Sequence, residues 1–95
     1  MKKLEQLILE TAKTVLGEVD TAGRSFYSPK EWKDRGERYG LQSELIVVHD
    51  GGDLASFFNP DYGSWKLQSA MNEALEKVGY YAEPCTTWYT AIYKM

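Results

Sequence analysis

The sequence predicts a small α+β domain, and three observations lead to that prediction. Leu45–Val48 is an apolar run without a polar break, which is typical of a strand covered on both faces. Elsewhere, apolar residues recur at the three- and four-residue spacing of amphipathic helices, and the chain closes with two β-rich segments. The length of 95 residues corresponds to one domain, residues 1–95, which can bury a core without disulfides or metals.

Three helices are expected. The first covers about residues 3–16, where apolar residues form one stripe and a glycine follows. The second covers about residues 29–39, because Ser28 can cap its first turn and Glu31 completes a capping box. The third covers about residues 64–78, again with one apolar stripe and a glycine after it.

The strands are expected at about residues 44–49, 80–85 and 88–94, with a short edge strand at 24–27 as a further option. The strand–helix–strand order predicts a right-handed crossover between parallel strands 44–49 and 80–85. The last strand has apolar or aromatic residues on both faces, so we expect it to return antiparallel between the other two. The prediction is a small two-layer domain in which a mixed three-stranded sheet carries helices on at least one face.

Composition narrows the function classes. The net charge of −3 argues against wholesale phosphate binding. No apolar run approaches the roughly 20 residues that a membrane-spanning helix needs, so no membrane contact is expected. The single Cys85 has no intramolecular partner, and acidic residues interrupt the apolar start of the chain, so we expect a cytoplasmic location.

A polar glycine loop, His49-Asp50-Gly51-Gly52-Asp53, follows the central strand, and ligand sites in open sheets collect at such strand ends. One hypothesis is a divalent metal site of Mn²⁺, Fe²⁺ or Zn²⁺, or a hydrolytic site, with the ligands His49, Asp50, Asp53 and Asp61. The motif lacks a ligand pair of fixed spacing, so no cofactor is expected by default. The favoured interpretation is a tight turn with left-handed glycines and aspartates that bind backbone N–H groups.

Two further hypotheses for the chemistry of this loop have less support in the sequence. Gly51 and Gly52 can cradle an anion through backbone N–H groups, but the flanking Asp50 and Asp53 would repel it. Cys85 with His49 as its base would be a nucleophilic pair only if their strands were neighbours. With the last strand between them, about two strand spacings of 4.8 Å separate the backbones, and a buried inert thiol is expected.

The segment 24–39 combines basic and aromatic residues, which suggests nucleic-acid binding. Three acidic residues interrupt it, and the chain as a whole is acidic, so a solvated, salt-bridged face is favoured over nucleic acid as a partner. The basic residues in question are Arg24, Lys30, Lys33, Arg35 and Arg38.

The function favoured by the sequence is a non-enzymatic binding or regulatory module, because no catalytic triad, carboxylate pair or nucleotide motif is visible. Aromatic residues make up 14% of the chain, and one helical layer cannot cover two aromatic faces of a sheet. We therefore expect contact with another protein, or self-association as a homodimer, through the C-terminal sheet residues and Trp65. The acidic stretch 50–61 would steer a basic partner, and an inhibitor or accessory protein of a phage or mobile element is one version of this hypothesis. The predicted interface residues are Trp65, Tyr80, Tyr81, Trp88, Tyr89 and Tyr93.

Overall fold

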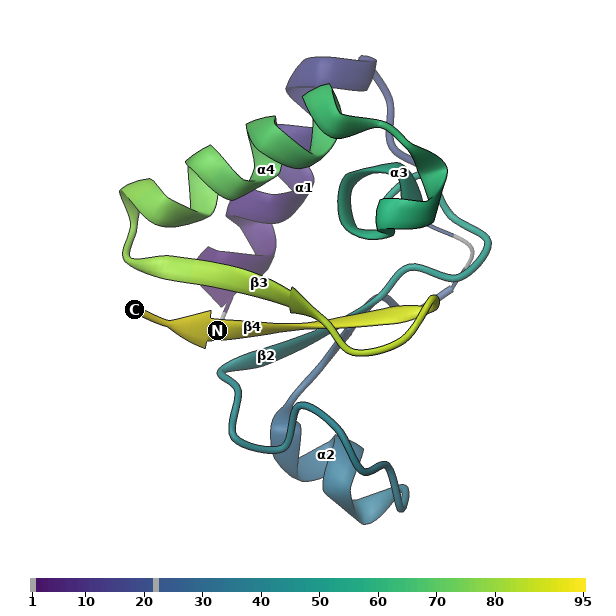
Figure 1. Cartoon of the computed structure of the whole chain (residues 1–95), viewed down its shortest axis with the longest axis vertical. Helices are drawn as coiled ribbons and strands as arrows, with labels where there is room; N and C mark the ends of the chain where they lie inside the picture. Colours follow the sequence, from purple (N-terminus) through teal and green to yellow (C-terminus); the bar gives the residue numbers. More distant parts are fainter. Residues whose placement is uncertain (1, 22) are drawn as a thin grey trace.

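The computed structural model describes residues 2–21 and 23–95, in which helices lie on both sides of a four-stranded sheet (Figure 1). The α+β class predicted from the sequence is confirmed. In chain order the elements are α1 (Lys2–Leu16), β1 (Phe26–Tyr27), α2 (Pro29–Asp34), β2 (Leu45–Val48), α3 (Ala55–Phe58), the 3-10 helix η1 (Pro60–Tyr62), α4 (Trp65–Lys77), β3 (Tyr80–Pro84) and β4 (Tyr89–Lys94).

The strand order is β1-β2-β4-β3, so the last strand does lie between β2 and β3 as predicted. Ile46 in β2 is opposite Ala91 in β4, and Tyr81 in β3 is opposite Tyr93. The prediction of a mixed sheet was wrong. Every neighbouring pair is antiparallel, because β4 separates the two strands that run in the same direction. The optional edge strand at 24–27 is confirmed as β1, which pairs with β2 and makes four strands.

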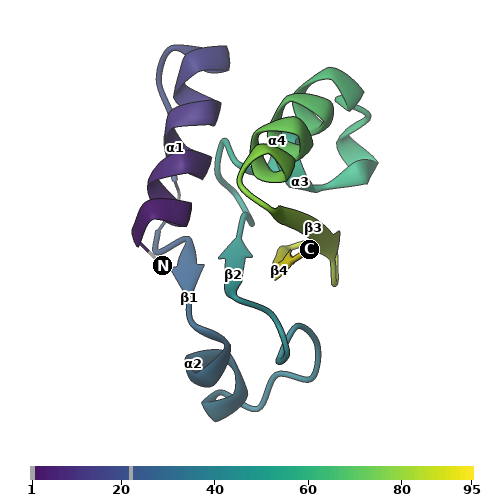
Figure 2. The same cartoon turned by 90° about the vertical axis from the view of Figure 1, so that its left-hand side faces the viewer.

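One face of the sheet carries most of the core. Helices α1 and α4 lie side by side over this face, with α3 beside them (Figures 1 and 2). The apolar stripe of α1 buries Leu4, Ile8 and Ala12, and α4 buries Met71 and Leu75. These side chains pack against the strand residues that alternate toward them, Leu45, Val47 and Ile92.

The opposite face is covered in part by α2. Trp32 of this helix is fully buried and packs against Ile46, Tyr89 and Ala91. The Trp32 and Tyr89 ring centroids are 4.9 Å apart in an edge-to-face arrangement, a favoured geometry for aromatic pairs. The fold therefore has a third layer that the predicted two-layer description lacked, because one large indole from a short helix can cover a second face.

Helix α2 is shorter than predicted: it ends at Asp34 instead of residue 39. Gly36 adopts a left-handed φ of 89°, its N–H donates to the carbonyl of Lys33, and the Glu37 N–H donates to the carbonyl of Trp32. These bonds close the helix end at a glycine, which takes this conformation at little cost. The predicted start is confirmed, because Ser28 and Glu31 form the capping box.

The stretch before α4 contains α3 and η1, which the sequence analysis did not predict. Phe57 and Phe58 of α3 are buried against the main core. The Asn59 side chain accepts a hydrogen bond from the Asp61 N–H and starts η1. In residues 2–21 and 23–95, no helix has both the length and the apolar character needed to cross a membrane.

Candidate functional site

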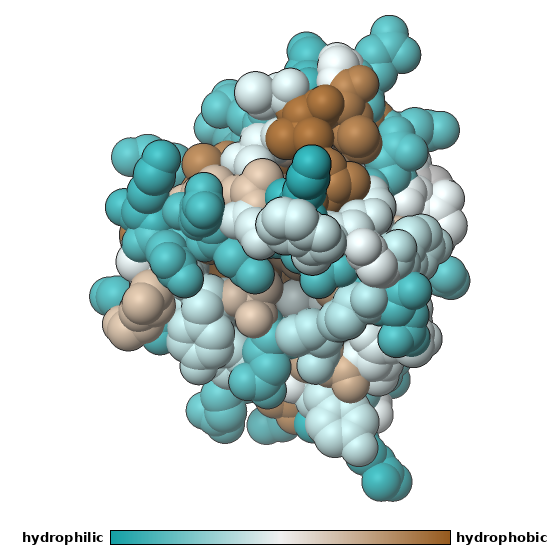
Figure 3. All heavy atoms as spheres, turned by 45° about the horizontal axis from the view of Figure 1, so that its top comes forward, coloured by the Kyte–Doolittle hydropathy of each residue, from teal (hydrophilic) through white to brown (hydrophobic). Residues whose placement is uncertain are grey.

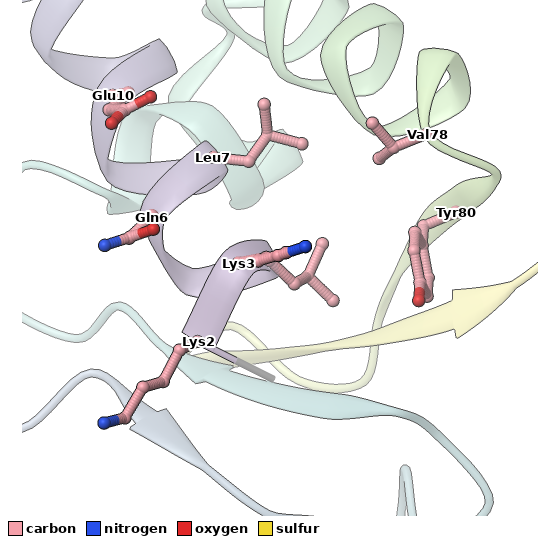
Figure 4. A pocket seen from close by; sticks show the side chains of 8 residues that line it. Lys2, Lys3, Gln6, Leu7, Glu10, Val78 and Tyr80 are labelled. Carbon is pink, nitrogen blue, oxygen red and sulfur yellow. The ribbon is translucent and has the colours of Figure 1, made fainter.

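A groove of about 930 Å³ lies between the start of α1, the end of α4 and the start of β3. Its apolar walls are Leu4, Leu7, Val78 and Tyr80. Figure 4 shows Leu7 pointing from α1 toward α4, with Val78 and Tyr80 on the other side of the groove. Exposed apolar concavities of this kind are typical binding sites in folded proteins.

The local sequence explains why this surface stays open. Leu4 lies on the buried stripe of α1, whereas Leu7 lies on its flank and is only half-buried. Helix α4 ends after Lys77, and Gly79 adopts a φ of 88° that turns the chain into β3. Val78 therefore lies at the bend, where it is 52% exposed.

The rim of the groove is mainly cationic. Lys2 and Lys3 line it, together with Gln6 and the single acid Glu10. In Figure 4 the Lys3 side chain extends toward the groove, and Lys2 points away from it. Lys94 is opposite Tyr80 in the β3–β4 register, which adds a further positive charge at this end of the sheet.

The six predicted interface residues do not form one surface. Tyr80 lines the groove, and Trp65, the first residue of α4, is 69% exposed at a different place. Tyr81 is 42% exposed and stacks on Tyr93, with ring centroids 5.5 Å apart. On the α2 side, Trp88 is half-buried next to Trp32.

Tyr89 corrects the sequence prediction most clearly. It is only 1% exposed, because Trp32 of α2 packs over it, so it is not available for a partner. The expectation that the helices cover only one face of the sheet is therefore wrong for the part of the second face beneath α2. Tyr81 and Tyr93 lie on the same face beyond this cover.

The glycine loop after β2 has the contacts of a tight turn. Gly51 takes a left-handed φ of 76°. The Asp53 carboxylate accepts a hydrogen bond from the Asp20 N–H at 2.7 Å, and the Asp53 N–H donates to the Asp20 carbonyl at 2.8 Å. These two bonds connect the loop to the segment that follows α1, as the turn interpretation expects of an aspartate.

His49 is buried at the end of β2. It is 2% exposed, its Nε2 atom lies 3.0 Å from Thr90 Oγ1, and its ring stacks on Phe58 with centroids 5.8 Å apart. Burial lowers the pKa of His49 from 6.5 to about 4, and the nearby Asp50 carboxylate opposes this shift only in part. At neutral pH the imidazole is therefore uncharged.

The four predicted metal ligands are not brought together. His49 is buried against Thr90, Asp53 binds backbone, Asp50 is exposed, and Asp61 lies in η1. Across the part of the chain that the structure describes, no group of three or more His, Cys, Asp or Glu side chains could hold a metal ion. The geometry gives no support to the predicted metal or hydrolytic site.

Cys85 and His49 lie on opposite faces of the sheet. Cys85 packs against the cluster beneath α2, whereas His49 stacks on Phe58 of the main core. Burial raises the pKa of the Cys85 thiol, so the thiolate is disfavoured at neutral pH. The two side chains do not form a nucleophile and base.

The basic segment 24–39 is partly neutralised by its own acids. Arg24 binds Glu31 at 2.8 Å, and Arg35 lies 3.7 Å from Glu37. Both guanidinium groups also lie over aromatic rings, Arg24 over Tyr27 and Arg35 over Trp32. The predicted salt-bridged face is present, and Lys30, Lys33 and Arg38 are further exposed cations of the same segment.

No known protein family, curated protein or solved structure matches the chain, so the assignment of function depends on its own geometry. The groove residues Leu7 and Val78 were visible in the sequence only as members of helical stripes. Helical periodicity shows which residues share a face, but it cannot show that the end of α4 lies beside the start of α1.

Proposed function

We propose that this chain is a non-enzymatic binding module that acts in the cytoplasm by contact with another protein, which inserts apolar side chains into the groove. The single observation that supports this most is the groove of about 930 Å³ with its apolar walls, among them Leu7, Val78 and Tyr80. Burial of apolar surface contributes roughly 25 cal/mol per Å², so a partner that fills this groove gains affinity directly.

The rim favours an amphipathic partner segment with acidic residues beside its apolar anchors. Of the two lysines that line the groove, Lys3 extends toward it, beside the one lining acid, Glu10. Lys94 lies opposite Tyr80 at the same end of the sheet. Opposite charge around an apolar contact guides association and selects among partners. The acidic loop 50–61 begins at the other end of β2, so a basic region of the same partner would meet it separately.

Other exposed apolar surface exists on the helical side of the molecule. Figure 3, in which the helical end comes forward, shows hydrophobic residues gathered near that end. Helix α1 exposes Leu9, Val15 and Leu16. These residues provide a control for the groove, because they are apolar and exposed but do not line it.

The test is an affinity capture with matched variants. The tagged chain, Val78→Glu and Val15→Glu are each used to capture partners from cells of the source organism, with quantitative mass spectrometry. We expect one protein to be captured equally by the original chain and Val15→Glu, and at least ten-fold less by Val78→Glu. A peptide array of that protein should locate the bound segment to apolar residues with acidic neighbours.

Circular dichroism first checks that Val78→Glu is folded, which we expect because Val78 is half exposed at a helix end. Three results would then count against the proposal. Equal capture by folded Val78→Glu, or a bound segment that is basic, would exclude the groove. A concentration-dependent dimer lost in Val78→Glu would make a second copy of the chain the occupant instead of a different protein.

A further inference from the structure

A second pocket, of about 220 Å³, lies at the end of β2, where the loop after α1 and the β3–β4 hairpin also meet. The charged or ionisable residues that line it are Arg24, Arg35, His49 and Asp50, and its apolar walls include Leu54 and Trp88. It shares no residue with the groove, so it needs an explanation of its own.

Two of the arginines that line this pocket have guanidinium groups near the same aromatic ring. Their carbon atoms lie 4.2 Å (Arg24) and 5.5 Å (Arg35) from the centroid of the same Tyr27 ring. Arg24 donates from Nε to the Phe26 carbonyl and from Nη2 to Glu31, which leaves Nη1 for another acceptor. Arg35 is only loosely paired, with its nearest carboxylate oxygen at 3.7 Å.

The pocket also contains a negative charge. Asp50 lines it and is exposed, directly after the buried His49. A simple anion would be attracted by the two arginines but repelled by this carboxylate. A simple cation would be attracted by the carboxylate but repelled by the arginines. The pocket therefore suits a ligand that carries both charges.

A third observation comes from His49. Its Nε2 atom is bound to Thr90, whereas its Nδ1 atom is buried and has no hydrogen-bond partner among the described residues. Most buried polar atoms in folded proteins have a partner, and each exception calls for an explanation. His49 also lines this pocket, and the exception is explained if a polar group of a bound ligand reaches its Nδ1 atom.

We propose that this pocket binds a small α-amino acid in its zwitterionic form. The carboxylate lies against Arg24 and Arg35, the ammonium group lies against Asp50, and a short side chain contacts Leu54 and Trp88. The volume of about 220 Å³ is below the range of roughly 300–1,000 Å³ typical of sites for larger ligands, which favours a ligand of few atoms.

The first experiment separates the zwitterion from its parts. Thermal unfolding is measured with 10 mM L-alanine or glycine, and with 10 mM acetate or methylamine as single-charge controls. We expect the amino acids to raise the melting temperature by about 2 °C or more, because a ligand that binds only the folded state stabilises it. Acetate and methylamine should leave it unchanged.

The second experiment locates the site by calorimetric titration with L-alanine. Arg35→Gln and Asp50→Asn should each weaken binding at least ten-fold. Arg38→Gln and Asp61→Asn remove the same charges from exposed positions outside the pocket and should bind as the original chain does. Circular dichroism and the melting temperature without ligand confirm that each variant is folded.

The proposal is overturned if neither amino acid binds, or if acetate or methylamine binds as tightly as L-alanine. It is also overturned if folded Arg35→Gln and Asp50→Asn both bind L-alanine as the original chain does. Because the groove variant Val78→Glu leaves this pocket unchanged, failure of one proposal does not affect the other.

Discussion

His49 connects the end of β2 to the start of β4. Its backbone N–H donates to the Trp88 carbonyl, and its side chain binds Thr90, which is fully buried. A histidine in this position contributes packing against Phe58 and one hydrogen bond while it stays neutral. The same burial makes the side chain sensitive to acid, because a charged imidazole is disfavoured there.

Acid should therefore destabilise the protein through His49. Its pKa is about 4 in the folded chain and 6.5 without burial, so the stabilising neutral form is fully present above pH 6.5. As the pH falls from 6.5 to 4, the unfolded chain takes up a proton that the folded chain does not, and up to about 3 kcal/mol is lost. We expect urea unfolding at several pH values to show this fall.

The matched variant for this prediction is His49→Gln, which has no titrating group but can still bind Thr90. Its unfolding free energy should fall less over the same pH range, because only the carboxyl groups then contribute. If the two proteins lose the same stability between pH 6.5 and 4, His49 is not held neutral by the fold.

Gly40 and Gly36 allow a test of close packing at the residue level. Both have a left-handed φ, 81° and 89°. A Cβ atom on Gly40 would lie 2.8 Å from Ile46 Cδ1 and 3.0 Å from Ala91 Cβ, whereas one on Gly36 would meet nothing within 4 Å. Gly36→Ala should cost about 1 kcal/mol from backbone strain, and Gly40→Ala about 1–3 kcal/mol more from overpacking.

Denaturant unfolding of the two glycine variants measures this difference. Equal losses of stability would show that the 35–44 segment does not pack closely on the sheet. Gly36→Ala is the matched control for Gly40→Ala, because both substitutions add the same methyl group to a residue with a left-handed φ.

Among the helices and strands, α2 is the element whose start is most clearly set by neighbouring residues. The Ser28 hydroxyl accepts from the Glu31 N–H, and the Glu31 carboxylate accepts from the Ser28 N–H. The hydrogen bond from the Ser28 backbone, followed by the contact with Arg24, lowers the pKa of Glu31. The capping box positions the first turn, and Trp32 then covers the sheet.

Ser28→Ala should lower the free energy of unfolding by about 1 kcal/mol, because it removes the side-chain cap of α2. Ser69→Ala, on the exposed side of α4, is the control and should change stability by a few tenths of a kcal/mol at most. Denaturant unfolding monitored by tryptophan fluorescence compares them. An equal effect of the two substitutions would contradict a stabilising role for the cap.

The elements that could be predicted from the sequence are those set by local chemistry. The capping box at Ser28, the stripe of α1 and the two apolar faces of β4 each depend on a few neighbouring residues. The end of α2 at Gly36 was missed because a glycine is tolerated inside a helix as well as at its end. Helix α3 was missed because one buried turn has too few residues to show a period.

The candidate sites were less predictable for a related reason. The groove depends on Leu7 and Val78, which are 71 positions apart in the numbering and meet only through the packing of α1 on α4. The burial of Tyr89 depends on Trp32, from a helix on the face that the prediction left open. Contacts between distant segments leave no spacing signal in a single sequence.

At the scale of the whole molecule, the charged groups are separated along the sheet. Lys2, Lys3 and Lys94 lie at the groove end of the sheet, near the end of β4, and the acidic loop follows the other end of β2. With a net charge of only −3, this separation rather than the total decides which partner region approaches which end. The groove supplies apolar contact, and the charges orient the partner.

The account depends most on the claim that the groove is the contact surface for a partner. Site-specific photo-crosslinking tests it directly, with a photoreactive phenylalanine analogue placed at Val78 or, as the control, at Val15. We predict that the captured protein is crosslinked from position 78, through an apolar segment with acidic neighbours, and not from position 15. Crosslinks from position 15 but none from position 78 would contradict the account.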